Sequence, residues 1–367
     1  MSTELFRRPL RRQPPAQPKG EIVLESPPEL PESVSGGGMS QALTYIPMAA
    51  GAGSTALLVT GAGGSPITYL ASGMMALSML GMMSGSMGRA SGEKRRRLDG
   101  DRRDYQRYLG QIRRRVRRVA EQQRTAALWH HPDPGSLWCI ALGTRLWERR
   151  PIDGDFLSVR VARGAQRLGV TLVTPETKPV EDLEPISAGS LRRFVRAHSS
   201  VAHLPVAIQF GAFARIAFTG PKRDVRRLAR AVIAQLVTFH SPDDVVVAVC
   251  AGAQEQDAWE WIKWLPHGLA TDAYDAVGQV RLMSDDLLAL EGMFGETLTS
   301  RPRFGTAGGG EETPHVIVVI DGGRVPPEAQ LATGLVQGVT VLDLNSVLGT
   351  DYHTGLLSSR SSRARCR

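Results

Sequence analysis

The chain has 367 residues and a formal net charge of +8 at neutral pH, so it has room for two or three structural modules. Its three cysteines are far apart and lack the spacing of metal ligands, which excludes a disulfide framework and favours free thiols in a reducing compartment. A basic chain suggests nucleic-acid binding, but the excess lies mainly in residues 1–40 and 89–124, so its placement has to be explained first.

Residues 1–40 are rich in Pro, Arg, Glu and Ser, contain few aromatic residues and end in a Ser-Gly-Gly-Gly stretch. Such a composition predicts a disordered tail, here on the cytoplasmic side. The alternative for residues 21–28 is a short strand that docks on a partner.

Residues 41–88 contain two apolar runs, 42–60 and 67–83, without a charged residue in either. Each run approaches the roughly 20 residues that cross a bilayer, and a glycine-rich turn at 61–66 separates them. We therefore predict a hairpin of two transmembrane helices, whose small residues allow close helix packing. A secretory signal peptide fits poorly because the first run begins at residue 42. The other alternative is a buried helical hairpin.

The charges on both sides of these runs predict the orientation. Five basic residues precede the first run, and Arg89, Lys94 and the arginines at 95–97 follow the second. The positive-inside rule places both termini in the cytoplasm, as in a multi-pass protein of the cell (inner) membrane. Cations at this position would attract anionic lipid head groups, which explains the basic excess without nucleic acid.

Residues 89–128 predict one long basic helix. Tyr105, Leu109, Ile112 and Val116 recur in steps of four and three, which is typical of a coiled-coil seam, amid 14 Lys and Arg and five Asp and Glu. We interpret it as a stalk between membrane and soluble domain. The alternative is an amphipathic helix that folds back on that domain or lies on lipid. A His-His-Pro-Asp-Pro sequence at 130–134 marks its end and lacks further metal ligands.

Residues 129–350 alternate between apolar strands and amphipathic helices, which predicts a doubly wound α/β domain. Helices are expected at 224–237 and 284–297. Strands are expected at 156–162, 169–174, 205–210, 215–219, 244–250, 315–321 and 339–344. The Ser- and Arg-rich end, 351–367, predicts an unstructured tail.

One strand–turn–helix unit resembles a degenerate P-loop, the phosphate-binding G-x-x-x-x-G-K-[ST] motif. Counting from Gly220, the second glycine is Val225, the lysine is Arg226 and the hydroxyl residue is Arg227. Val225 crowds the place where the loop must approach phosphate, and Arg227 puts a cation where the metal ligand belongs. Lys222 and Arg226 retain positive charge for an anion.

Asp321 ends an apolar strand, like the Walker-B aspartate near Mg²⁺, but two glycines follow it in place of a glutamate. The pattern predicts a degenerate RecA-type domain with cofactor-binding candidates Gly220, Lys222, Arg226 and Asp321, and without catalytic or metal-ligating residues. The sequence predicts no intact cofactor site, and we expect no ATP hydrolysis by this domain alone. The tryptophan-rich stretch 259–267 predicts either core packing or an interaction surface.

Three segments carry a resemblance to a known family: 155–161, 228–245 and, most specifically, Trp-Ile-Lys-Trp-Leu-Pro-His at 261–267. With the apolar runs and the basic helix they resemble the amino-terminal part of EccC, the membrane-anchored FtsK/SpoIIIE-family ATPases of type VII (ESX) secretion. The resemblance extends to about Asp343. The Ser- and Arg-rich end does not resemble the family, which leads to the hypothesis of a truncated, frame-shifted or split-gene product.

The resemblance implies a membrane-anchoring and coupling part of a secretion ATPase. It implies ATP and Mg²⁺ as family cofactors, other type VII membrane components as partners, and self-association. Helical-hairpin substrates would be exported by further P-loop modules that this chain lacks. The alternative, from the FtsK/SpoIIIE kinship and the basic helix, is a DNA translocase or DNA-tethering protein, although the charge placement makes DNA the less expected partner. An inactive remnant is a third possibility.

Overall fold

The computed structural model describes residues 8–30, 66–175, 179, 182–305, 314–333, 335–344, 348 and 356–360, and for 66–94, 271–272 and 356–360 the backbone alone. The chain divides into two compact units. The first, here the α/β unit, comprises Met1–Gln17, Gln122–Gln166 and Ala202–Arg367. The second, here the helical unit, comprises Pro18–Glu121 and Arg167–Val201.

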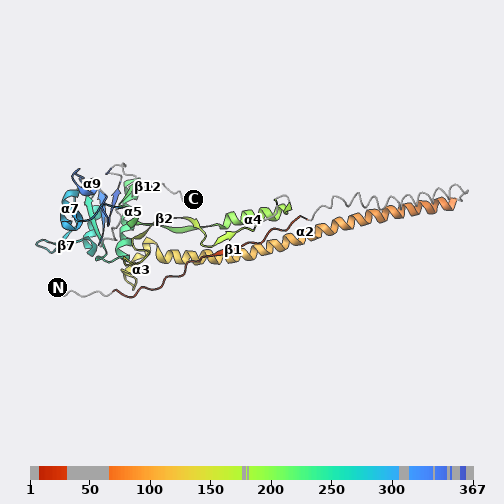
Figure 1. Ribbon diagram of the computed structural model, residues 1–367, viewed down its shortest axis with the longest axis horizontal. Helices are drawn as coiled ribbons and strands as arrows, with labels where there is room; N and C mark the ends of the chain where they lie inside the picture. Colours follow the sequence, from red (N-terminus) through yellow and green to blue (C-terminus); the bar gives the residue numbers. More distant parts are fainter. Residues whose placement is uncertain are drawn as a thin grey trace. The chain divides into compact units, whose positions relative to one another are not determined.

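A parallel sheet of order β12-β5-β11-β10-β6-β9 organises the α/β unit (Figure 1). Its strands are β5 (Arg215–Thr219), β6 (Val245–Ala251), β9 (Met283–Ser284), β10 (His315–Asp321), β11 (Val339–Leu344) and β12 (Leu356–Arg360). The strand β11 therefore lies between β5 and β10, whose carboxyl ends carry the predicted site.

Helices cover both faces of this sheet, as predicted for a doubly wound domain. On β6, Val245, Val247 and Val249 join the core formed with α5 (Lys222–Phe239), whereas Val246 and Ala248 join a second core with α7 (Leu287–Phe294). Alternate residues thus face opposite layers, and every residue of β6, β10 and β11 is buried. The continuous apolar runs in the sequence reflect this double burial.

Shorter elements complete the α/β unit. β2 (Ser158–Arg167) pairs with β4 (Ser200–Gln209), and β7 (Leu269–Tyr274) forms an antiparallel hairpin with β8 (Gln279–Arg281). The others are η1 (Pro134–Ser136), α3 (Leu137–Ala141), η3 (Phe210–Ala212), α6 (Gln256–Trp259), η4 (Glu260–Trp264), η5 (Pro266–Gly268), α8 (Glu296–Thr299) and α9 (Gln330–Thr333).

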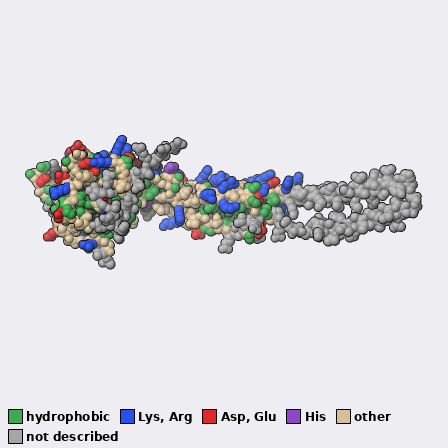
Figure 2. Space-filling model, turned by 90° about the horizontal axis from the view of Figure 1, so that it is seen from above, with side chains coloured by type: hydrophobic (Ala, Val, Ile, Leu, Met, Phe, Trp, Pro, Cys, Tyr) green, Lys and Arg blue, Asp and Glu red, His purple; other side chains and the backbone are tan. Residues whose placement is uncertain are grey.

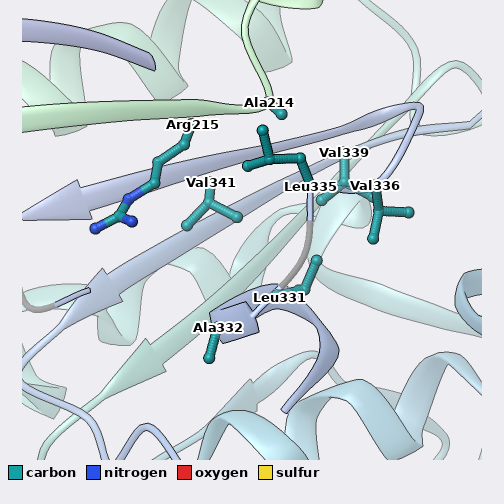
Figure 3. A pocket seen from close by; sticks show the side chains of 8 residues that line it. All are labelled: Ala214, Arg215, Leu331, Ala332, Leu335, Val336, Val339 and Val341. Atoms are coloured by element: carbon teal, nitrogen blue, oxygen red, sulfur yellow. The ribbon is translucent and has the colours of Figure 1, made fainter. Parts of the chain in front are cut away.

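A small apolar hollow lies at the amino ends of β5 and β11, so it is at the opposite sheet edge from the predicted nucleotide site (Figure 3). Its lining is Ala214, Arg215, Leu331, Ala332, Leu335, Val336, Val339 and Val341. The only charged member, Arg215, forms a buried ion pair with Asp343 of β11. The other seven lining residues are aliphatic.

The helical unit is built on α2 (Pro66–His130), a continuous helix of 65 residues whose last turns belong to the α/β unit (Figure 1). It includes the predicted stalk and, without a break, the second apolar run. The other elements of this unit are α4 (Pro185–His198) and a parallel pair of short strands, β1 (Glu21–Val23) and β3 (Thr171–Val173).

The predicted seam of α2 packs against the same chain. Tyr105, Leu109 and Val116 are 2–6% exposed, and the Tyr105 hydroxyl donates to the backbone oxygen of Glu25 at 3.1 Å. Gln106 reaches α4 through a 2.9 Å hydrogen bond to Ser190. The seam therefore packs against other segments of the helical unit.

The amino end of α4 depends on a buried glutamate. Glu184 accepts hydrogen bonds from the backbone of Ile186 at 3.1 Å and Ser187 at 2.7 Å, and it pairs with Arg102 of α2 at 2.8 Å. Burial alone would raise the pKa of Glu184, but these hydrogen bonds lower it to about 2. The carboxylate therefore caps α4 and ties it to α2.

Two predictions about the chain's ends differ from the structure. Residues 8–30 are ordered rather than disordered, since Ile22 and Leu24 are buried and β1 pairs with β3. β12 occupies part of the predicted C-terminal tail and pairs with β5.

Of the predicted membrane hairpin, 42–60 lies outside the described residues and 67–83 forms early turns of α2. In the part of the chain that the structure describes, no helix combines the length and apolar character required to cross a bilayer. The membrane part of the predicted fold thus lacks structural support.

Candidate functional site

The turn between β5 and α5 is too short to form a phosphate-binding loop. Only Gly220 and Pro221 separate the strand from the helix, and Gly220 has the positive φ of 152° that favours glycine. The backbone N–H groups of Asp224 and Val225 donate to the carbonyl of Pro221 at 2.8 and 3.1 Å. Pro221 itself has no N–H. The groups that cradle phosphate in a P-loop are therefore partly missing and partly bonded within the turn.

Arg226 fills the space in front of Asp321. Its Nε lies 2.5 Å from one carboxylate oxygen of Asp321, and one terminal nitrogen lies 3.2 Å from the other. The indole N–H of Trp259 donates to the same carboxylate at 2.9 Å. Asp321 is only 1% exposed. A two-pronged guanidinium and an indole thus occupy the carboxylate that would otherwise contribute to a magnesium site.

A second carboxylate extends this group of charges. Glu255, beyond the end of β6, forms an ion pair with Lys222 and lies 3.3 Å from Arg226. The hydrogen bond to Asp321 is the main reason that the pKa of Arg226 is raised above its ordinary value. We refer to Lys222, Arg226, Glu255 and Asp321 as the ion-pair cluster; its two cations and two carboxylates balance each other.

The backbone closes tightly around the cluster. A Cβ atom on Gly252 would lie 2.4 Å from the backbone oxygen of Gly322 and 2.9 Å from the carboxylate of Glu255. Gly322, with a φ of 73°, also faces Glu255. Both glycines are needed because the chain leaving β6 and the chain leaving β10 almost touch.

The residues present do not fit ATP and Mg²⁺. The Lys position carries a guanidinium already committed to Asp321, and within the described residues no group of three or more His, Cys, Asp or Glu side chains is arranged for a metal. The structure brings Lys222, Arg226 and Asp321 together, as their sequence positions suggested, with Gly220 in the adjoining turn. Their mutual neutralisation gives the cluster a structural character, so we derive no hydrolytic step from it.

Sequence reasoning missed Glu255 and the role of Trp259. Glu255 follows a predicted buried strand, and parallel strands end at the same edge, so its place near Asp321 was in principle detectable. The tryptophan-rich stretch combines both of its predicted interpretations: Trp259 is fully buried, whereas Trp264 is 79% exposed.

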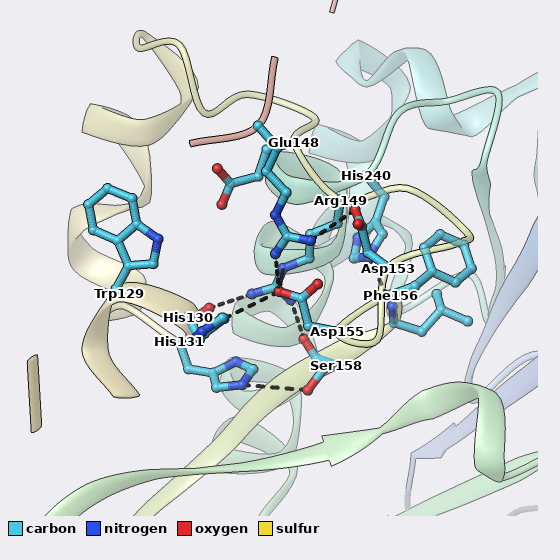
Figure 4. Close-up of polar contacts among 12 residues, drawn as sticks. Trp129, His130, His131, Glu148, Arg149, Asp153, Asp155, Phe156, Ser158 and His240 are labelled. Atoms are coloured by element: carbon cyan, nitrogen blue, oxygen red, sulfur yellow. Dashed lines mark hydrogen bonds and ion pairs between the residues drawn. The ribbon is translucent and has the colours of Figure 1, made fainter. Parts of the chain in front are cut away.

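A second polar cluster surrounds Arg149, a side chain only 2% exposed (Figure 4). Its guanidinium donates to the backbone oxygens of Ser158, at 2.5 Å, and His130, and Nε lies 3.4 Å from Asp155. Burial lowers the pKa of Arg149 to about 10, which is still high enough to keep the guanidinium protonated at neutral pH. The bonds join the end of α2 to the start of β2, so this cluster holds the α/β unit's entry segment in place.

Three buried histidines in the α/β unit, His240, His267 and His315, and the half-buried His131 are neutral. Burial lowers the pKa to about 4 for His131 and His267 and to about 3 for His240 and His315. The Leu157 N–H donates to Nε2 of His240 at 3.0 Å, so its Nδ1 carries the proton, 2.9 Å from the Leu236 carbonyl. Among the residues that the structure describes, no carboxylate hydrogen-bonds to these rings, which favours a packing role.

The fold and the ion-pair cluster together define a parallel α/β unit compatible with a P-loop-like domain whose nucleotide position is closed by its own side chains. No family model matches the chain. Over its whole length it is 49% identical to the ESX secretion system protein EccC of Thermomonospora curvata, of which it covers 28%. It is 35% identical over 88% of its length to ESX-3 secretion system protein EccC3 of Mycobacterium tuberculosis, covering 24% of that protein. It is 30% identical over 96% of its length to EccCa1 of the ESX-1 system of the same species, covering 47%.

The chain belongs to the EccC family of ESX secretion-system proteins. This confirms the resemblance carried by the segments at 155–161, 228–245 and 261–267. The chain spans less than half the length of each of these relatives. Their names place them in protein-secretion systems, and nothing in the comparisons favours the alternative of a DNA translocase.

Proposed function

We propose that this chain is a non-hydrolysing coupling part of a type VII secretion machine, which links motor modules to the membrane complex. The observation that carries the proposal is the pairing of Arg226 with Asp321, at 2.5 Å, in the position that nucleotide and metal would need. A P-loop-like unit that neutralises its own site keeps the shape of a motor domain without its chemistry. The names of the relatives support the secretion context.

The membrane part of the proposal rests on the sequence. The runs 42–60 and 67–83 carry no charge and basic residues flank both, so we infer an anchor at 41–88 with both termini in the cytoplasm. Spheroplast proteolysis provides the test. We expect an epitope tag at either terminus to resist protease that is added to intact spheroplasts. Removal of either tag without prior lysis of the spheroplasts contradicts this topology.

The basic surface of the helical unit supports a second part of the proposal, which is contact with lipid. Lys and Arg side chains gather along it (Figure 2), and Arg95–Arg97 and Arg103 are exposed. We infer contact with anionic lipid where α2 leaves the apolar run, since a basic segment gains about 1 kcal/mol per residue near such a surface. The predicted partners are other secretion-system membrane components and further copies of this chain. Helical-hairpin substrates would be moved by additional modules of the longer family members.

Nucleotide titration of the full chain tests the central claim. We expect no saturable binding of Mg·ATP up to millimolar concentration, because Arg226 and Lys222 are paired with carboxylates. Micromolar binding of Mg·ATP that disappears in Lys222→Ala would refute the closed site. Co-purification with the other membrane components of the secretion system tests the coupling role, and its absence in a strain that assembles the system contradicts that role.

A further inference from the structure

Two arginines near the amino terminus, Arg8 and Arg11, dock on an acidic surface of the α/β unit. Arg8 reaches Asp244 at 2.6 Å, Ser241 at 2.5 Å and Asp243 at 3.7 Å. Arg11 reaches Asp153 at 2.9 Å and Asp155 at 2.5 Å. We call Arg8 and Arg11 the arginine pair, and the four carboxylates at 153, 155, 243 and 244 the aspartate patch.

Side chains alone hold this segment. Within the described part of the chain, no backbone hydrogen bond is recorded between residues 8–17 and any other segment. Between the two arginines, Leu10 is 90% exposed, and the adjacent Arg12 is exposed as well. The contact therefore consists of two arginine anchors spaced three residues apart, with the intervening chain in solvent. Such a contact can dissociate without the loss of any secondary structure.

The aspartate patch is held in shape by other residues. Asp155 lies 3.4 Å from Arg149 and 3.3 Å from His130, and Asp244 accepts from Ser241 at 2.9 Å. Burial alone would raise the pKa of Asp155, but hydrogen bonds with His130 and Arg11 and the charge of Arg149 hold it well below its ordinary value. The patch is therefore a preformed anionic receptor for guanidinium groups.

The chain that follows the arginine pair is suited to reach outward. Residues 13–20 include three prolines and precede β1, which belongs to the helical unit. A proline-rich segment extends by about 3.1 Å per residue, so a fully extended stretch of roughly ten residues reaches about 30 Å. Its length allows the arginine pair to reach a second copy of the chain.

We propose that the aspartate patch is an exchangeable docking site for the arginine pair, and that in assemblies of this chain the pair of one copy binds the patch of a neighbouring copy. The inference rests on the self-association included in the proposed function and adds a specific contact to it. The occupant is defined by what the patch already binds: an extended segment with arginines at positions i and i+3. The same contacts form in either case, so exchange costs no interaction energy beyond the loss of freedom on association.

A mixing experiment with full-length protein in detergent tests the exchange. The donor-dead variant is Arg8→Ala/Arg11→Ala, and the receptor-dead variant is Asp153→Asn/Asp155→Asn. A milder receptor variant, Asp153→Asn/Asp243→Asn, leaves the Asp155–Arg149 contact intact in case the first fails to fold. Tagged donor-dead protein is used as bait, with untagged receptor-dead protein or untagged donor-dead protein as prey. We expect the bait to retain about tenfold more of the receptor-dead prey, because only that mixture contains one intact pair and one intact patch.

The control is Arg12→Ala, which removes an exposed arginine and has to self-associate like the wild type. Equal retention of the mixed and unmixed variants, with the wild type still assembling, overturns the exchange and leaves the proposed assembly standing. A wild type that does not self-associate overturns both.

A labelled peptide of residues 7–13 tests the receptor without assembly. It has to bind the donor-dead variant about tenfold more tightly than the wild type, whose patch is already filled, and equal binding to the two proteins overturns the proposal.

Discussion

The ion-pair cluster makes a quantitative prediction for Arg226→Met. The substitution keeps most of the aliphatic volume but removes the guanidinium from a carboxylate that is 1% exposed. Breaking a buried pair by deleting one partner costs about 3–5 kcal/mol, because the other charge stays buried. Trp259 continues to donate to Asp321, and the Arg226 side chain is 20% exposed, so we expect the lower end, about 3 kcal/mol. For a unit of this size that lowers the Tm by roughly 6–12 °C.

Intrinsic fluorescence is the appropriate assay, because all six tryptophans lie in the α/β unit. Urea unfolding followed in this way reports on the unit that contains the cluster. The matched control is Arg227→Met, an exposed neighbour on α5 that should change stability by less than about 0.5 kcal/mol. Adding Asp321→Asn to Arg226→Met should restore at least half of the loss, since the unpaired charge disappears. A loss below about 1 kcal/mol for Arg226→Met, or no recovery in the double variant, refutes the view that the pair holds the site closed.

Three further predictions concern other parts of the structure. Gly252→Ala should destabilise the α/β unit by about 2–4 kcal/mol in the same fluorescence assay, since its Cβ would lie 2.4 Å from a backbone oxygen, whereas Gly154→Ala, with open space around it, should be nearly neutral. The pKa of His240 is lowered to about 3, so its stabilising effect is complete above its unfolded pKa near 6.5 and is lost as the pH falls from there toward 3. Urea midpoints should therefore drop between pH 7 and 4, and less steeply for His240→Gln; identical slopes contradict the assignment. Glu184→Ala should accelerate hydrogen exchange of the α4 amides by about 5- to 30-fold through loss of a cap worth about 1–2 kcal/mol, and unchanged exchange contradicts the capping role.

Much of the α/β unit could be predicted from the sequence because its strands are buried on both faces. The ranges 215–219, 315–321 and 339–344 match β5, β10 and β11 residue for residue. α4 was missed because its signal is weak: Pro185 follows a glutamate cap, and Gly189 and Ser190 interrupt the apolar pattern. The ordering of residues 8–30 was missed because it depends on distant partners. A proline-rich segment has no local preference for order, and its contacts come from distant residues, among them β3, Tyr105 of α2 and the aspartate patch.

The candidate site could be predicted from the sequence only in part. Counting along the P-loop motif correctly located an arginine in the lysine position, but not what its side chain would contact. That depends on tertiary geometry: α5 leads away from β5 and β10 ends at the same sheet edge, so Arg226 and Asp321 meet although 95 residues separate them. The same geometry brings in Glu255 and Trp259, which no motif includes.

The closed site also constrains how such a unit can change. An arginine that merely replaced a catalytic lysine would leave Asp321 as a buried, unpaired carboxylate, which costs several kcal/mol. The two-pronged pairing, the indole N–H and the near-contact of Gly252 with Gly322 each remove part of that cost. Restoring nucleotide binding would therefore require more than Arg226→Lys, because a single ammonium cannot reproduce the guanidinium's contacts with both oxygens of Asp321. A longer loop between β5 and α5 would be needed as well, to supply phosphate with free backbone N–H groups. The closure of the site and the stability of this fold thus depend on the same group of side chains.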